Sequence, residues 1–168
     1  MSEAGEEIVE YWLNLKGYFI MKNLKIRRNK EIDFLAITLG EPDEMLDKKA
    51  HIEVHASAYS RAIGRGHWPP STYAERIVKN KFEDPVVVEE VVKRLGEDYS
   101  KVAIWGSYGR RKPDREARKA LFNELEKRGV TVIPFEEVLE EVEEKIGTGM
   151  YVHPALRTIQ YYKFKPEW

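Results

Sequence analysis

Two short strand-like segments carry carboxylates inside an apolar pattern, and they constrain the fold more than any other feature. They are residues 31–37 (EIDFLAI) and 51–57 (HIEVHAS). Because strand side chains alternate between faces, Glu31 and Asp33 share one face of the first segment. By the same alternation, His51, Glu53 and His55 share one face of the second. Burying a carboxylate is costly unless it is paired or bound to a cation. If the two strands are neighbours, Asp33 and Glu53 converge, which is the minimal requirement for holding a divalent cation.

The rest of the chain predicts a mixed sheet covered by helices. Apolar periodicity and turn signals predict helices over residues 6–16, 72–81, 84–95, 114–128 and 136–146, and strands over 18–26, 31–39, 51–57, 101–106 and 130–135. Short connections make the first three strands an antiparallel meander, whereas the later strands alternate with helices and pair in parallel. We therefore expect an α/β domain over residues 1–149. Residues 150–168 form an aromatic tail that packs on this core or on a second copy of the chain.

Composition indicates a globular protein of one domain. At 168 residues, with 42% hydrophobic and 34% charged residues, the chain can bury a sizeable core, and its apolar runs are too short to span a bilayer. The absence of cysteine excludes disulfides and thiolate metal sites. The acidic start lacks the layout of a signal peptide, so we expect a cytoplasmic protein. Abundant charges of both signs with a single glutamine are typical of heat-loving organisms.

The paired carboxylates point to Mg²⁺ or Mn²⁺, which prefer hard oxygen ligands. Asp33 and Glu53 are the candidate metal ligands, and the carbonyl of Val54 could supply another. Such a cation neutralises phosphate charge and acidifies a bound water. His55 follows Glu53 by two residues on the same face, and could orient or deprotonate that water. An open alternative is that both acids are solvated residues on an exposed sheet face, paired with Lys22 or Arg27.

At these positions the sequence resembles the PD-(D/E)XK nuclease superfamily, whose motif is an Asp on the second strand and Glu-x-Lys on the third. The matching residues are Asp33 and Glu53-Val54-His55. The N-terminal part is most similar to archaeal Holliday-junction resolvases, through Glu6 and Gly17-Tyr18-Phe19. The resemblance implies a restriction-endonuclease-like fold and a metal-dependent endonuclease, with nucleic acid, DNA more than RNA, as its partner. It also implies an assisting role for Glu6 and a homodimer.

The sequence departs from this family at His55, which stands where the catalytic lysine is expected. Histidine is mostly neutral at pH 7, whereas lysine is charged. His55 could act as a base or a metal ligand, and Lys22 or Lys30 could supply the missing cation. It could equally be an ordinary hydrogen-bonded histidine, and Glu6 an acid favoured by the helix dipole. Two interpretations therefore stay open: an active nuclease, or a catalytically inactive nuclease-fold module that binds nucleic acid or protein.

Two basic segments are candidate nucleic-acid-binding surfaces despite a formal net charge of −1. Lys25, Arg27 and Arg28 lead directly to Asp33. Arg61 and Arg65 lie in a loop that also carries aromatic residues, which could stack on bases. The alternative for the first segment is a solvated hairpin whose charges protect a sheet edge from aggregation.

Overall fold

The computed structural model describes residues 4–57, 68–107 and 112–165, and its elements confirm the expected α/β class. The N-terminal half contains α1 (Ala4–Leu15), β1 (Phe19–Ile26), a 3-10 turn η1 (Arg27–Asn29), β2 (Lys30–Ile37) and β3 (Lys49–Ser57). The crossover from β3 contains α2 (Pro70–Ile77), a π-helical turn η3 (Val78–Phe82) and α3 (Pro85–Leu95). Then follow β4 (Ser100–Ser107), α4 (Lys112–Glu126), β5 (Val130–Pro134), α5 (Phe135–Lys145) and α6 (Pro154–Phe164).

The five strands form one mixed sheet in the order β1-β2-β3-β4-β5. The pairs β1–β2 and β2–β3 are antiparallel, as the short connections predict, and β3–β4 and β4–β5 are parallel. The central strand β3 therefore has an antiparallel neighbour on one side and a parallel neighbour on the other. Because the chain reaches β4 only after three helical elements, these elements are free to cover one face of the sheet.

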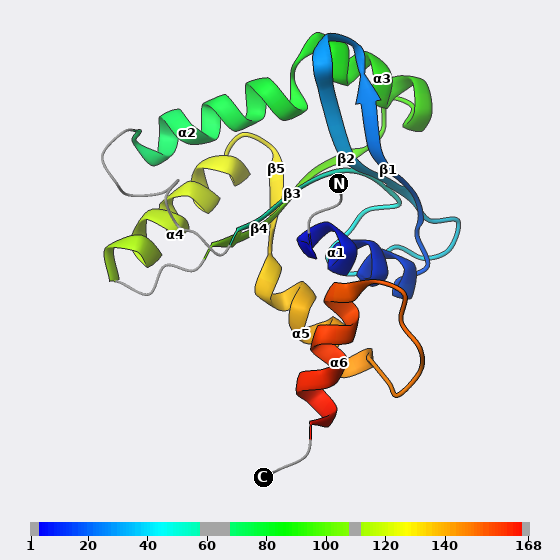
Figure 1. Ribbon diagram of the computed structural model, residues 1–168. Coiled ribbons are helices and arrows are strands. Elements are labelled where there is room, and N and C mark those ends of the chain that lie inside the picture. The colour runs from blue at the N-terminus through cyan, green and yellow to red at the C-terminus, as the bar shows by residue number, and fades with distance from the viewer. Residues whose placement is uncertain (1–3, 58–67, 108–111, 166–168) are drawn as a thin grey trace.

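Helices cover both faces (Figure 1). Helices α1, α5 and α6 lie on one face, over a core that includes Trp12, Ile52 and Ile104. Helices α2 and α4 lie on the other, over a cluster built around Phe82 and Trp105. Helix α3 packs on the β1–β2 end of that second face. Since side chains alternate along β3, the residues beside Ile52 face α2 and η3 rather than α1.

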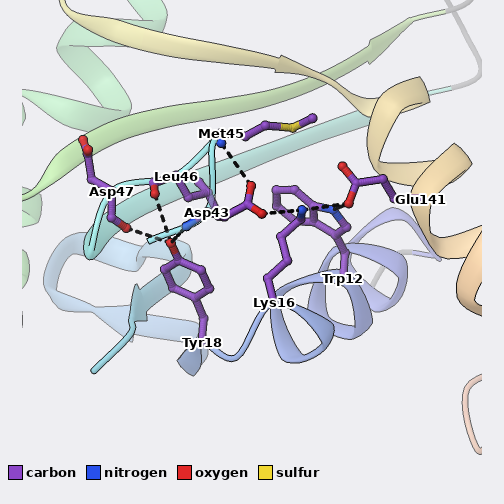
Figure 2. Close-up of polar contacts among 8 residues, drawn as sticks. All are labelled: Trp12, Lys16, Tyr18, Asp43, Met45, Leu46, Asp47 and Glu141. Carbon is purple, nitrogen blue, oxygen red and sulfur yellow. Dashed lines mark hydrogen bonds and ion pairs between the residues drawn. The ribbon is translucent and has the colours of Figure 1, made fainter. Parts of the chain in front are cut away.

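A polar cluster anchors the C-terminal end of α1 (Figure 2). The Lys16 ammonium lies 2.7 Å from a carboxylate oxygen of Asp43 and 2.7 Å from one of Glu141. The indole N–H of Trp12 donates to the same Glu141 oxygen at 3.1 Å. The Tyr18 hydroxyl lies 3.0 Å from the carbonyl of Leu46. These contacts tie the C-terminal end of α1 to α5 and to the loop between β2 and β3. They thereby help to fix the position of the whole helix against the sheet.

Residues 154–164 form helix α6, for which the sequence suggested no secondary structure. The helix packs on α1 through Leu156, which is buried, and its first turn is tied to α1 because the Ala155 N–H donates to Glu7 at 3.3 Å. Tyr161 and Tyr162 remain exposed. Within residues 4–57, 68–107 and 112–165, no helix combines the length and apolar character needed to cross a bilayer.

Candidate functional site

Regular strand pairing is interrupted at Asp33 on both sides of β2. The β2–β3 ladder runs from Ile37 to Phe34, which faces Ile52, and the next opposed positions are Asp33 and Glu53. On the other side of β2 the β1 ladder skips Asn23, whose φ is 51°, in the left-handed region. The backbone around Asp33 is therefore left out of regular pairing on both sides, and its side chain lies in a gap between strands.

The Asp33 carboxylate bridges this gap. Its Oδ2 accepts a hydrogen bond from the Val54 N–H at 2.8 Å. Burial, followed by the charge of nearby Glu53, raises the pKa of Asp33 to about 7, against the opposing effects of the Val54 N–H and Lys81. The Glu6 charge raises this pKa further. A cation bound between two carboxylates that repel each other would offset this repulsion. The sequence-based prediction that Asp33 and Glu53 lie side by side agrees with this geometry.

Glu53 is buried and is held on both of its oxygens. Its Oε1 lies 3.0 Å from Nε2 of His51, a fully buried ring that packs against Phe82 at 4.9 Å between ring centroids. Its Oε2 lies 2.6 Å from Nζ of Lys81 in a close ion pair. Because His51 supports the carboxylate from inside, the Oε2 side of Glu53 faces the pocket and Lys81.

Lys81 comes from the π-helical turn η3, between α2 and α3. In this turn the Glu83 N–H donates to the carbonyl of Val78, five residues earlier, at 2.9 Å. Lys79 points outward and pairs with Glu75, whereas Lys81 turns toward Glu53. Burial lowers the pKa of Lys81, but Glu53 and then Asp33 outweigh it, so the net pKa is raised. The ammonium therefore stays charged at neutral pH.

Lys81 is the functional candidate that sequence reasoning missed. The two lysines that it considered instead are engaged elsewhere: Lys22 pairs with Glu10 at 2.6 Å, and Lys30 pairs with Asp84 at 2.8 Å. Neither lies among the residues that line the pocket around Asp33. The position expected to carry the lysine, His55, lines that pocket too, but its ring stacks on Trp105 with 4.1 Å between centroids.

These side chains surround a carboxylate pocket of about 350 Å³. Its lining residues are Glu6, Asp33, Glu53, Val54, His55, Tyr73, Ile77, Lys81, Ala103 and Trp105. Acids line the wall formed by α1, β2 and β3, and the ammonium of Lys81 enters from η3. Glu6 contributes a buried Oε2 that has no hydrogen-bond partner among the residues the structure describes. The pocket is thus lined by three carboxylates, by the ammonium of Lys81 and by the aromatic side chains of Tyr73 and Trp105.

A close contact between α1 and β3 sets the position of Glu6. A Cβ added to Gly5 would lie 2.4 Å from Cβ of Ala56, so only glycine lets the helix approach this closely. Alanine is the better helix former and would normally stabilise a helix. We expect Gly5→Ala instead to destabilise the protein by about 1–3 kcal/mol, as overpacked contacts do. Urea unfolding measures the change. Gly40→Ala is the control, because its nearest atom would be 3.8 Å away; equal or greater stability of Gly5→Ala than wild type contradicts the prediction.

The pocket suits a cation that keeps much of its water shell. Across the described parts of the chain, no three or more His, Asp or Glu side chains form a group that could hold a metal ion by themselves. Asp33 and Glu53 provide two carboxylates, and Mg²⁺ is usually bound through one or two carboxylates with waters and substrate phosphates. Oε2 of Glu6, unpartnered within the described part of the chain, is a further acceptor in the same pocket. The donor set fits such an open site and does not fit a closed cage of protein ligands.

Three of the predicted nucleic-acid-binding residues, Lys25, Arg27 and Arg28, are not among those that line this pocket. Lys25 is opposite Glu31 in the β1–β2 hairpin, and Arg27 pairs with Glu89 of α3 at 2.7 Å. Arg28 lies in η1 with a φ of 60°. The other two candidates, Arg61 and Arg65, lie outside the described residues.

No family model, curated protein or solved structure matches this chain. The distinctive features of the chain are the interrupted strand pairing at Asp33, the carboxylates of Asp33 and Glu53, and the ammonium of Lys81.

Proposed function

We propose that this protein is a metal-dependent endonuclease that hydrolyses nucleic-acid phosphodiesters in the carboxylate pocket. The observation that carries the proposal is the meeting of Asp33, Glu53 and Lys81 in one pocket at the opened edge of β2 and β3. Acidic residues alone are common on protein surfaces. An acid whose pKa is raised by burial and by a second carboxylate, beside a charged lysine, is far more typical of a reaction centre.

The proposal includes a restriction-endonuclease-like fold. It is supported by the order of the elements, in which α1 precedes an antiparallel meander of three strands and a helical crossover leads to the parallel strand β4. It is also supported by the positions of Asp33 on the second strand and Glu53 on the third. These are the positions at which the sequence resembles the PD-(D/E)XK motif.

In this proposal each residue has a separate task. Asp33 and Glu53 bind Mg²⁺ or Mn²⁺, which when bound neutralises the scissile phosphate and acidifies a water. The Val54 N–H fixes the Asp33 carboxylate, and His51 fixes Glu53 from the buried side. Such supporting contacts hold the two carboxylates in the orientation that binds the metal ion. Oε2 of Glu6, which has no hydrogen-bond partner among the described residues, can accept a hydrogen bond from a water in the pocket.

In this proposal Lys81 takes the role of the catalytic lysine, whose place in the sequence motif is occupied by His55. Its pKa is raised, so it acts as a cation and not as a base. A half-exposed ammonium can leave the Glu53 oxygen and pair with a phosphate oxygen of the substrate. There it stabilises the negative charge that grows on phosphorus-bound oxygens during hydrolysis, which is the largest requirement of phosphoryl-transfer chemistry.

A nicking assay tests the activity. Branched, duplex and single-stranded DNA are incubated with Mn²⁺ between about pH 6 and about pH 9, where the Asp33 carboxyl ionises. We expect cleavage that is lost by roughly 10³-fold in Asp33→Asn, because a bound cation supplies several kcal/mol and each 1.36 kcal/mol is tenfold in rate. The matched control is Asp98→Asn, which removes an exposed carboxylate just before β4.

Three outcomes bear on the proposal. Cleavage by wild type and by Asp98→Asn, but not by Asp33→Asn, supports it. Cleavage that survives Asp33→Asn indicates a contaminant or another site and contradicts it. Binding of DNA without metal-dependent cleavage of any substrate also contradicts it, and favours an inactive nuclease-fold module.

A further inference from the structure

A second hollow adjoins the carboxylate pocket, at the start of α2. It encloses about 330 Å³ and is lined by Trp68, Tyr73, Arg76, Ile77, Asn80 and Lys81. Tyr73, Ile77 and Lys81 also line the carboxylate pocket, so the two spaces share a wall. We call this space the Trp68 hollow. Its size is within the range of ligand sites, about 300–1,000 Å³.

Trp68 is presented as a platform. The guanidinium carbon of Arg76 lies 4.0 Å from the centroid of the indole, which covers one side of the ring. Even so, 51% of the Trp68 surface remains exposed. A large aromatic side chain is usually hidden from water, and this one is braced by Arg76 while much of it stays open. The arrangement leaves an oriented aromatic surface for a ligand.

The chemistry of the hollow matches a nucleotide. An indole provides a stacking surface for a base, and Arg76 adds a cation at the ring. The side-chain amide of Asn80 can both donate and accept hydrogen bonds, as base edges require. Lys81, which lines both spaces, supplies an ammonium that can pair with a backbone phosphate. The hollow thus combines an aromatic surface, an amide and cationic groups.

A base can use this platform only when it is unpaired. Within a duplex both faces of each base are covered by stacked neighbours, so Trp68 has nothing to stack on until the base is displaced. A single strand offers the π-face of every base and has a flexible backbone. The hollow therefore distinguishes substrates by strand state and not by sequence.

We propose that the Trp68 hollow binds an unpaired nucleobase and makes single-stranded or frayed nucleic acid the substrate class of this protein. The inference rests on the proposed function, since the same strand continues past Lys81 to Asp33 and Glu53. It goes beyond that function because it assigns a binding site next to the reaction centre and a preference that the carboxylates cannot supply.

Equilibrium binding without metal tests the site. Fluorescence anisotropy of a labelled oligothymidine and of a duplex of equal length is measured in EDTA with the full chain. We expect Trp68→Ala to weaken single-strand binding about 5- to 100-fold, the range that loss of one base–aromatic stack gives. Trp68→Phe keeps an aromatic ring and should fall between the two. Phe19→Ala, which removes an exposed aromatic on β1, is the control and should bind like wild type.

The outcomes separate this inference from the proposed function. Unchanged single-strand binding by Trp68→Ala, or equal weakening for single strand and duplex, overturns the inference even if wild type nicks DNA with Mn²⁺. Selective weakening supports the inference, and it does so even if no nicking is found and the proposed function fails. Absence of oligonucleotide binding by wild type overturns the inference and indicates that the hollow serves another ligand, such as a peptide.

Discussion

Replacing Asp33 with asparagine is expected to raise the melting temperature of the protein at about pH 8, although the same change should remove most of the proposed nuclease activity. In the folded protein the pKa of Asp33 is raised from 3.8 to about 7, chiefly by burial and by Glu53. Above pH 7 the ionised carboxylate therefore costs folding free energy, because each tenfold change in an acid dissociation constant corresponds to about 1.36 kcal/mol. Asparagine has no charge, and its carbonyl oxygen can still accept the Val54 N–H. We expect a gain of roughly 2–4 kcal/mol.

The sign of the pH dependence follows from proton binding. Between about pH 4 and about pH 7 the folded state keeps the Asp33 proton that the unfolded state has lost. The contribution of Asp33 to stability therefore falls as the pH rises through this interval. Asparagine does not titrate, so the difference between the variant and wild type should be small near pH 4 and largest above pH 7. Thermal unfolding followed by circular dichroism at several pH values measures this difference.

Divalent cations provide the control. A ligand that binds only the folded state raises its melting temperature. At about pH 8, Mg²⁺ or Mn²⁺ should stabilise wild type and Asp98→Asn but not Asp33→Asn, in which one of the two carboxylates is gone. The interpretation is contradicted if Asp33→Asn is less stable than wild type at every pH, or if Mn²⁺ stabilises it as much as wild type.

The carboxylate pair could be predicted because it depends on local rules. Side chains alternate along a strand, and short connections make consecutive strands neighbours, so Asp33 and Glu53 had to share a face. The loop of residues 38–48 then sets the register that opposes Phe34 to Ile52. The antiparallel meander and the parallel pairing of the later strands followed from the same connection lengths. No information from distant parts of the chain was needed.

Lys81 could not be predicted in this way. It lies 28 residues beyond Glu53 in the sequence, on a helical segment whose apolar pattern is that of an ordinary helix. Lys81 reaches Glu53 from a π-helical turn, and Phe82 of the same turn packs against His51 of β3. Similarly, the pairing of Arg27 with Glu89 depends on where α3 docks. Both pairings depend on contacts between elements that are far apart in the sequence. The apolar periodicity of each element does not indicate such contacts.

Replacing Lys81 with methionine is expected to lower the cleavage rate by roughly 10²- to 10³-fold, the cost of removing one group that stabilises transition-state charge. Methionine keeps an unbranched side chain of nearly the same length but carries no charge. Lys81 also lowers the pKa of Asp33, so its removal should raise that pKa further. The residual activity should therefore need a higher pH than wild-type activity. A pH–rate profile measures both effects, and a rate like that of wild type, or a profile that does not move toward higher pH, contradicts the prediction.

Two variants show whether the cation at Lys81, and not the imidazole at His55, serves the reaction. Lys79→Met removes an exposed lysine of the same helical turn that pairs with Glu75, and it should cleave like wild type. His55→Phe keeps a ring that can stack on Trp105 but removes both ring nitrogens. If Lys81 supplies the charge, His55→Phe loses less activity than Lys81→Met. The reverse order would assign the role to His55, as the resemblance of residues 53–55 to the Glu-x-Lys motif suggests, and would leave Lys81 as a structural partner of Glu53.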